Sequence, residues 1–367
     1  MVKKLTVEQA RDLRARSQLY NPRAKRPGTA PGAVEHVIGL QAQDLNAASL
    51  QLRARTTGLA GTDFVRALHV ERSLVRTWCF RGTLHIVAAE DVRWVLEILG
   101  NRLVSSSRRR NAALGIDECD AGRADHLITG ALEKNGPLTR AELFERLNAK
   151  GVSTAGQRGI HLLNHAGYRA LICYGPPRDG VDTFALMDEW IARGRTRSPD
   201  EGIVELVRRY VRGYAPATVA DFQWWSGLPA AECRAAWEGL AGELAEVKAG
   251  DATAWLPAPM KKQCAGGRTW ARLLPSFDPC LLGYKDRSLI VEARHAKKVN
   301  AGGGIVRPVL VVDGKVTGTW KSVKKAGSVE IRLELFEKLS EEVSRSLDAD
   351  VSDVGRYLGV KTSLVVL

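Results

Sequence analysis

An internal repeat constrains the fold of this chain more than any other feature of its sequence. Residues 137–144 read PLTRAELF, and residues 216–223 read PATVADFQ. Each copy begins with proline and places a threonine, Thr139 or Thr218, three residues before an acidic residue. This is the capping-box pattern that starts a helix. Helical patterns precede and follow each copy, and two strand-like segments come last. Three helices followed by a two-stranded wing are typical of the winged helix.

The hydrophobic periodicity predicts the extent of each copy. The helices and the hairpin of the two clear copies are expected at 121–134, 154–169 and 170–186, and at 201–212, 230–240 and 244–256. The first 88 residues read as a third, more divergent copy, with helices at 6–20, 32–40, 46–55 and 62–72 and two strands within 75–87. A long helix over 88–109 joins this copy to the next.

The last quarter of the chain has a different pattern, rich in Val, Leu and Ile. It predicts strands at 270–282, 288–293, 305–312, 315–321 and 329–336. Asp313-Gly314 favours a tight hairpin turn between two of them. Several short strands indicate a small barrel or a curled sheet, closed by a helix over 337–358. The sequence thus predicts an α+β fold of winged helices at 1–115 (with the long linker helix), 116–197 and 198–262, and a β-barrel at 263–367.

Composition limits the function classes. The 367 residues include 54 Lys plus Arg against 41 Asp plus Glu, a net charge of +13, which favours a polyanionic partner. The six cysteines are too far apart for zinc-ligand spacing, so we expect no metal. The N-terminus lacks the apolar core of a signal peptide, and no apolar run approaches the ~20 residues of a membrane span. We therefore expect a cytoplasmic protein without membrane contact.

The candidate catalytic residues lie in the sequence Gln41-Ala42-Gln43-Asp44, directly after an apolar helical run. On a helix, residues i and i+2 point roughly 200° apart, whereas an extended backbone points both to one side. Two neutral amides can hold a water molecule, because each can donate and accept hydrogen bonds. Such a site suits hydrolysis of a bond whose leaving group is already good. The alternative for an isolated glutamine pair is simply a polar helix end.

Four groups of residues occur together in one order: GLQAQ at 39–43, RGTLH at 81–85, LLPSFD with LGYKDR at 273–287, and GGG with RPVLVVDG at 302–314. With them the chain resembles the AlkZ/YcaQ family of bacterial DNA glycosylases over nearly its full length. The resemblance implies three tandem winged helices and a β-barrel in a C shape around duplex DNA. Members of the family remove N-alkylated bases, and some unhook interstrand crosslinks made by alkylating natural products. We therefore expect a nucleoid-associated monomer that acts on double-stranded DNA containing alkylated bases, foremost N7-alkylguanine.

The catalytic signature of one branch of this family is Gln–apolar–Gln, and members of that branch resemble self-resistance enzymes of antibiotic producers. The resemblance implies that Gln41 and Gln43 hold the attacking water, with Gln43 nearest to it. The aspartate of the other branch would occupy position 43, so Asp44 does not correspond to that aspartate. Asp44 either fixes one amide or caps the helix that begins near Asn46. His85 either touches a phosphate or holds the wing by a hydrogen bond.

The candidate DNA contacts follow the same motifs: Arg81, Lys285, Arg287, Asp313, Gly314, Lys315 and Lys321. The hairpin at Asp313-Gly314, near Gly302-Gly303-Gly304, is narrow enough for a minor groove about 6 Å wide, or it merely closes the barrel. The glycine triplet lacks the ending of a nucleotide-binding loop, and we expect no cofactor. No lysine is marked as a nucleophile, so the enzyme is expected to be monofunctional. The alternative is a non-catalytic winged-helix DNA-binding protein, either a regulator or a lesion-binding shield.

Overall fold

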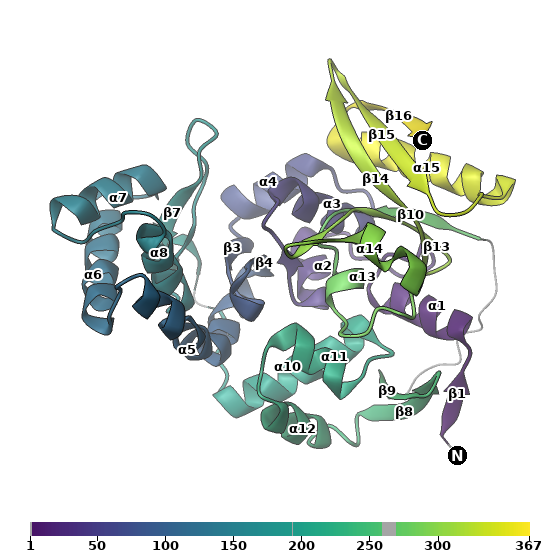
Figure 1. Ribbon diagram of the computed structural model, residues 1–367, viewed down its shortest axis with the longest axis horizontal. Coiled ribbons are helices and arrows are strands. Elements are labelled where there is room, and N and C mark those ends of the chain that lie inside the picture. The colour runs from purple at the N-terminus through teal and green to yellow at the C-terminus, as the bar shows by residue number, and fades with distance from the viewer. Residues whose placement is uncertain (1, 193, 259–268) are drawn as a thin grey trace. The chain divides into compact units, whose positions relative to one another are not determined.

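The computed structural model describes residues 2–192, 194–258 and 269–367. The chain forms two compact units (Figure 1). The first unit joins the residues up to Phe64 with Ile203–Leu367, and the second unit consists of Val65–Gly202. The expected boundary between the third winged helix and the barrel, at 262–263, lies outside the described residues. The division into three winged helices stays a prediction.

The first unit contains most of the strands. Its helices are α1 (Val7–Ser17), α2 (Ala30–Val37), α3 (Leu45–Arg55), α11 (Val219–Ser226), α12 (Ala230–Glu238), α13 (Pro279–Leu282), α14 (Ala296–Val299) and α15 (Glu341–Leu358). Its strands are β1 (Lys3–Leu5), β2 (Leu40–Gln41), β8 (Leu244–Ala249), β9 (Ala252–Pro257), β10 (Ala271–Leu274), β11 (Asn300–Gly302), β12 (Ile305–Val306), β13 (Val309–Val312), β14 (Lys315–Lys325), β15 (Ser328–Leu335) and β16 (Lys361–Val366). Two helices carry the chain between the units, α4 (Gly61–His69) and α10 (Pro199–Tyr214).

The second unit begins with an antiparallel hairpin and continues with helices. Its strands are β3 (Leu74–Trp78), β4 (Leu84–Ala88), β5 (Leu138–Thr139), β6 (Ile172–Tyr174) and β7 (Thr183–Leu186). Its helices are α5 (Ala89–Ala113), α6 (Glu118–Asn135), α7 (Arg140–Ala149), α8 (Arg158–Tyr168) and α9 (Met187–Trp190). The helices of the described ranges all lack the combination of length and apolar composition that a membrane span requires.

Both predicted capping boxes are confirmed. Thr139 Oγ1 accepts from the backbone N of Glu142 at 3.3 Å, and the Glu142 carboxylate accepts from the backbone N of Thr139 at 2.7 Å. Thr218 and Asp221 make the same exchange at 3.0 and 3.1 Å. These bonds satisfy backbone N–H groups that have no partner within a helix, and they fix where α7 and α11 begin.

The sheet of the third copy gains a strand that the sequence did not predict. β1 pairs in parallel with β8, so that the order of the sheet is β1-β8-β9. β1 is only three residues long and ends directly before the capping residue Thr6 of α1. Such a short segment gives too few alternating positions to be distinguished from a loop.

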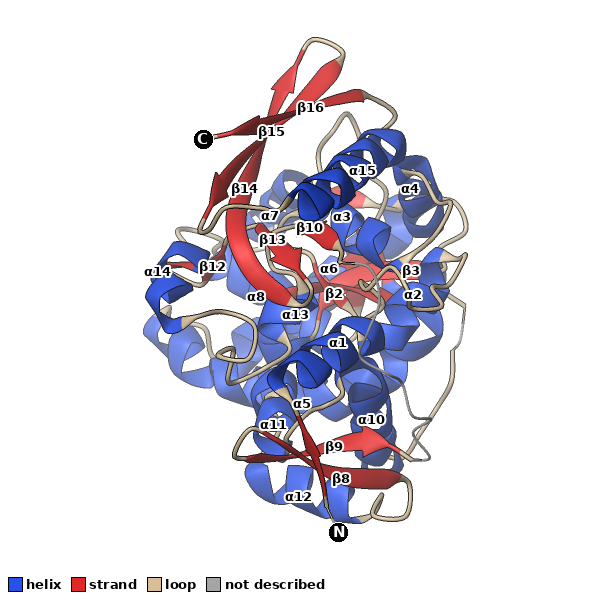
Figure 2. Cartoon of the chain, turned by 90° about the vertical axis from the view of Figure 1, so that its right-hand side faces the viewer, coloured by secondary structure: helices blue, strands red, loops and turns tan. Residues whose placement is uncertain are grey.

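The C-terminal strands form a five-stranded sheet in the order β10-β13-β14-β15-β16. β14 curves along its length (Figure 2), and the register shifts between Leu310 and Val311. Of the two predicted forms, the curled sheet is confirmed and the closed β-barrel is wrong, because β10 and β16 are the two edges of the sheet and do not pair with each other. The predicted closing helix is α15, which buries Leu347 and Val354 against Ile331 and Leu333.

Two strand predictions in this region were wrong, and one strand was not predicted. Residues 279–282 are the helix α13 and not a strand, because the Asp278 side chain caps it and Pro279 fits its first turn. Residues 288–291 form a turn, in which the carbonyl of Arg287 accepts from the backbone N of Ile290 and Val291, and Ala293 begins a short 3₁₀ helix. The apolar pair Ile290-Val291 is buried without a sheet. β16 was missed; it pairs in parallel with β15.

A buried ionic cluster ties α3, β10 and α15 together. Asp350 accepts from Arg53 Nη1 at 3.0 Å and from Arg272 Nη1 at 2.7 Å. Its second oxygen accepts from the backbone N of Leu273 at 2.7 Å. Burial opposes ionisation of Asp350, but the charges of Arg53 and Arg272 lower its pKa below the ordinary value. The cluster therefore fixes α3, the helix that follows the candidate catalytic loop.

Candidate active site

The glutamine pair lies outside any helix. α2 ends at Val37, Ile38 adopts a left-handed conformation with φ 64°, and Gly39 has φ 141°. Gly39 tolerates this conformation because it has no Cβ. The chain then continues as the short strand β2, which ends at Gln41. The expected extended or turning backbone at the pair is confirmed.

Burial alternates along this segment. Leu40 is 1% exposed and Ala42 is 0% exposed, whereas Gln41 is half-buried and Gln43 is exposed. In an extended chain, neighbouring side chains point to opposite faces. The two apolar residues therefore anchor the segment in the core and leave both amides on its solvent-facing side. Two amides so placed can bind one water molecule between them.

Asp44 caps α3. Its Oδ1 accepts from the backbone N of Asn46 at 2.9 Å and from that of Ala47 at 3.1 Å. Of the two roles considered for Asp44, these contacts favour the helix cap over the fixing of a glutamine amide. The cap also sets where the loop ends, because α3 begins at the next residue.

Two residues of α3 that were not predicted as site residues support the Gln41–Asp44 loop. The buried Gln51 side chain donates from Nε2 to the carbonyl of Gln41 at 3.1 Å and to the carbonyl of Ser276 at 3.2 Å. Arg55, one turn further along α3, donates to both carboxylate oxygens of Asp278. The sequence signal for these partners was weak. Polar Gln51, Arg53 and Arg55 lie within a helix whose other buried residues are mostly alanine.

The His85 side chain is buried in the second unit, against a backbone carbonyl and an aromatic ring. Its Nδ1 lies 2.9 Å from the carbonyl of Thr83, and its ring packs edge-on against Phe80 with centroids 5.4 Å apart. Burial lowers the pKa of His85 to about 4, so the ring is neutral at pH 7. A neutral, buried imidazole favours the wing-holding role over a phosphate contact. Arg81 lies at the turn of the same hairpin, partly exposed, with φ 56°.

The Asp313-Gly314 turn is packed against α1. A Cβ at Gly314 would come within 2.8 Å of the Arg11 Cβ, and Asp313 Oδ1 accepts from the backbone N of Trp270 at 3.1 Å. Lys315 forms ion pairs with Glu292 at 2.8 Å and with Glu337 at 3.1 Å. Of the two roles considered for this hairpin, these contacts favour closure of the sheet.

Other predicted DNA contacts lie on the surface of the first unit. Lys285 and Lys321 are exposed, and Arg287 is half-buried, with its Nη1 donating to Asn300 Oδ1 at 2.6 Å. The β11–β12 hairpin carries the exposed glycines at 302–304 followed by Ile305, whose side chain is 55% exposed. The glycines have no side chains, so the tip of this hairpin is narrow. The exposed apolar side chain of Ile305 lies next to it.

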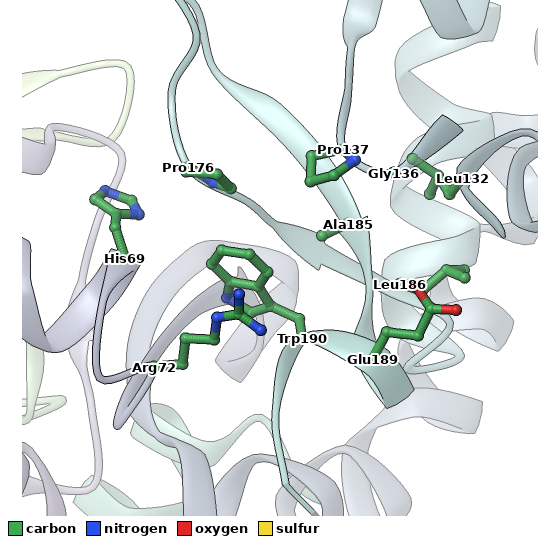
Figure 3. Close-up of a pocket in the computed structure, with 10 residues that line it drawn as sticks. All are labelled: His69, Arg72, Leu132, Gly136, Pro137, Pro176, Ala185, Leu186, Glu189 and Trp190. Atoms are coloured by element: carbon green, nitrogen blue, oxygen red, sulfur yellow. The ribbon is translucent and has the colours of Figure 1, made fainter. Parts of the chain in front are cut away.

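A separate cavity of about 330 Å³ opens in the second unit (Figure 3). The Arg72 guanidinium carbon lies 4.1 Å from the centroid of the Trp190 ring at this cavity. The cavity is lined by His69, Arg72, Leu132, Gly136, Pro137, Pro176, Ala185, Leu186, Glu189 and Trp190. None of the predicted site residues lines it.

Among the described residues, no group of three or more His, Cys, Asp or Glu side chains could hold a metal ion.

Comparison with known proteins identifies the family. The family model described as DNA glycosylase AlkZ-like matches residues 34–357. The interstrand DNA cross-link repair glycosylase of Streptomyces sahachiroi is 26% identical over 360 residues, which cover 95% of each chain. The solved structure of Streptomyces sahachiroi DNA glycosylase AlkZ matches with a TM-score of 0.83 and 25% identity, over 99% of this chain and 100% of that chain. Since the family model spans most of the chain and includes the Gln41–Asp44 loop, the chain belongs to the AlkZ-like family of DNA glycosylases.

Proposed function

We propose that this glycosylase hydrolyses the N-glycosidic bond of N-alkylated purines, foremost N7-alkylguanine, and that Gln41 and Gln43 are its catalytic residues. The observation that carries the proposal is the anchored loop, in which Gln41 is partly exposed and Gln43 is exposed, in a chain of this family. The cross-link repair named for the Streptomyces relative supports bulky adducts and interstrand crosslinks as further substrates. DNA repair or self-resistance would be the role in the cell.

The chemistry matches what two amides can do. Alkylation at N7 makes the purine cationic, so that the glycosidic bond is already weak and the base leaves without a strong acid. Catalysis then consists of placing a water molecule near the anomeric carbon and stabilising positive charge on the sugar. In the proposed mechanism, the Gln43 carbonyl oxygen accepts a hydrogen bond from the attacking water and Gln41 holds the same water from its other side. Asp44 is not required as a base, because its carboxylate already caps α3.

The proposed reaction is monofunctional, with water as the nucleophile. A lyase would need a lysine amine of lowered pKa. Lys315 has the opposite property, because the carboxylates of Glu292 and Glu337 raise its pKa. The abasic site should therefore remain intact after excision, and borohydride should trap no covalent adduct with DNA.

The proposed partner is duplex DNA, bound mainly through its phosphates by exposed basic residues that include Lys285 and Lys321. The β11–β12 hairpin is the proposed minor-groove probe, because its tip is narrow and its Ile305 side chain is exposed. We propose that the protein acts as a monomer, since the proposed catalytic residues lie on one loop of one chain.

The test is excision from a duplex that carries one N7-methylguanine. The expected product is an abasic site, detected as strand cleavage after mild alkali, with unmodified duplex as the control. Duplexes that carry a bulkier N7 adduct and a crosslink measure how far the substrate range extends. Intact DNA after long incubation with all three substrates would contradict the proposal and favour a non-catalytic DNA-binding protein.

A further inference from the structure

Gln51 connects the catalytic loop to a distant turn of the chain. It is 0% exposed and lies on α3, ten residues after Gln41. Its Nε2 donates to the carbonyl of Gln41 at 3.1 Å and to the carbonyl of Ser276 at 3.2 Å. Only the NH₂ end of an amide can donate to two carbonyls, so these two acceptors fix the orientation of the side chain.

The two carbonyls are not equivalent. The Ser276 carbonyl belongs to a turn that is already fixed, because Asp278 accepts from Arg55 of the same helix and also caps α13. Arg55 Nη1 further donates to the backbone carbonyl of Gln51 at 3.0 Å. Ser276 and α3 therefore form a rigid support. The Gln41 carbonyl, in contrast, belongs to the peptide that links Gln41 to Ala42, in the middle of the proposed catalytic pair.

We propose that Gln51 is a positioning residue for base excision, which holds the Gln41–Ala42 peptide so that both catalytic amides face one water molecule. The inference rests on the proposed function of the glutamine pair. The loop is also fixed at its start by the turn at Ile38-Gly39 and at its end by the Asp44 cap. Gln51 acts between these two points, where rotation of one peptide would turn the Gln41 side chain relative to that of Gln43.

The variant that tests this role is Gln51→Met, which keeps the length of the side chain and removes the donor. Gln51→Asn keeps the amide but is shorter by one methylene, and it provides a second variant if the methionine variant folds poorly. The matched control is Gln18→Met. Gln18 is equally buried, and its amide accepts from Arg55 Nη2 at 3.2 Å and donates to the Tyr284 hydroxyl at 3.0 Å. It contacts the same support without contacting the loop in any hydrogen bond of the described residues.

Two measurements separate positioning from a loss of stability. Hydrogen exchange of the backbone amides at 40–46 should accelerate in both Gln51 variants and remain unchanged in Gln18→Met. Single-turnover excision of N7-methylguanine should slow by about 10- to 100-fold in the Gln51 variants, since small misplacements of reacting groups cost rates of this order. The affinity for the same duplex should stay unchanged. Rates of the Gln18 variant should equal those of the wild type.

The outcomes are distinct from those for the proposed function. Unchanged exchange at 40–46 in the Gln51 variants would overturn the positioning role, whatever the excision rates are. Equal slowing of excision in Gln18→Met would also overturn it, because activity would then follow stability alone. If the wild type excised none of the tested bases, the proposed function would fail, and the exchange measurement would still decide whether Gln51 holds the loop.

Discussion

Arg55 and Asp278 form a bidentate ion pair, with N–O distances of 2.8 and 2.7 Å, and both side chains are fully buried. The pair joins α3 to the start of α13 across 223 positions of the sequence. Burial by itself disfavours the charge of Arg55, but the Asp278 carboxylate raises the pKa of the guanidinium above its ordinary value. The LPSFD motif that includes Asp278 is thus part of the support of the candidate catalytic loop.

Asp278→Asn should destabilise the first unit. The substitution leaves the Arg55 charge buried without its counter-charge, and breaking a buried pair in this way costs about 3–5 kcal/mol. Urea unfolding measures the change in the free energy of unfolding. Glu71→Gln, which breaks the exposed pair between Arg66 and Glu71, is the control and should change it little. Similar effects of the two substitutions would contradict the structural role of the buried pair.

Replacing Asp44 separates its two possible roles. Asp44→Ser keeps a side-chain oxygen that can cap α3, so excision should stay near the wild-type rate. Asp44→Ala should lower the free energy of unfolding by about 1 kcal/mol, because two backbone N–H groups lose their acceptor. If Asp44→Ser lost excision while remaining fully folded, the carboxylate would have a direct role at the glutamine pair.

His85 should make stability depend on pH. Burial lowers its pKa from 6.5 to about 4 in the folded protein. Between these values the unfolded chain binds a proton that the folded chain does not, so this contribution to stability is complete above pH 6.5 and is lost as the pH falls toward 4. His85→Gln should therefore flatten the pH dependence of unfolding in this window by about 1.4 kcal/mol per pH unit. Parallel curves for the variant and the wild type would refute this assignment.

The exposed lysines of β14 should contribute to DNA affinity through phosphates alone. Lys321→Ala and Lys324→Ala should each weaken binding of any duplex sequence and reduce the slope of log K against log salt by about 1. Lys325→Ala is a matched control on the same strand, because Lys325 already pairs with Glu330. Its effect on the slope should be smaller. Fluorescence anisotropy at several salt concentrations measures all three, and unchanged slopes for Lys321 and Lys324 would exclude them from the interface.

Local patterns predicted much of the fold. The threonine–acid spacing located the starts of α7 and α11, and the Asp313-Gly314 pair located the turn between β13 and β14. The strand predicted at 279–282 failed because apolar residues in a single helical turn have the same composition as a buried strand. β16 was missed because it lies on the sheet edge, where only one neighbour strand specifies it.

The candidate site was predictable only in part. The glutamine pair could be found because it interrupts an apolar pattern with two amides at a spacing that a helix does not use. Gln51 could not be found in this way, because its partners are backbone carbonyls, which every residue has. The ion pairs of Arg53 and Arg55 were equally hidden, since Asp350 and Asp278 lie more than 200 residues away along the chain.

In the proposed mechanism, the Gln43 amide positions the attacking water. The most direct test compares single-turnover excision of N7-methylguanine by the wild type and by Gln43→Ala, with duplex affinity measured in parallel. Gln223→Ala, which removes another exposed glutamine of the first unit, is the control. Excision by Gln43→Ala should fall by about 100-fold or more, with unchanged affinity and an unchanged Gln223→Ala rate. Excision by Gln43→Ala at the wild-type rate would show that the Gln43 amide does not position the attacking water.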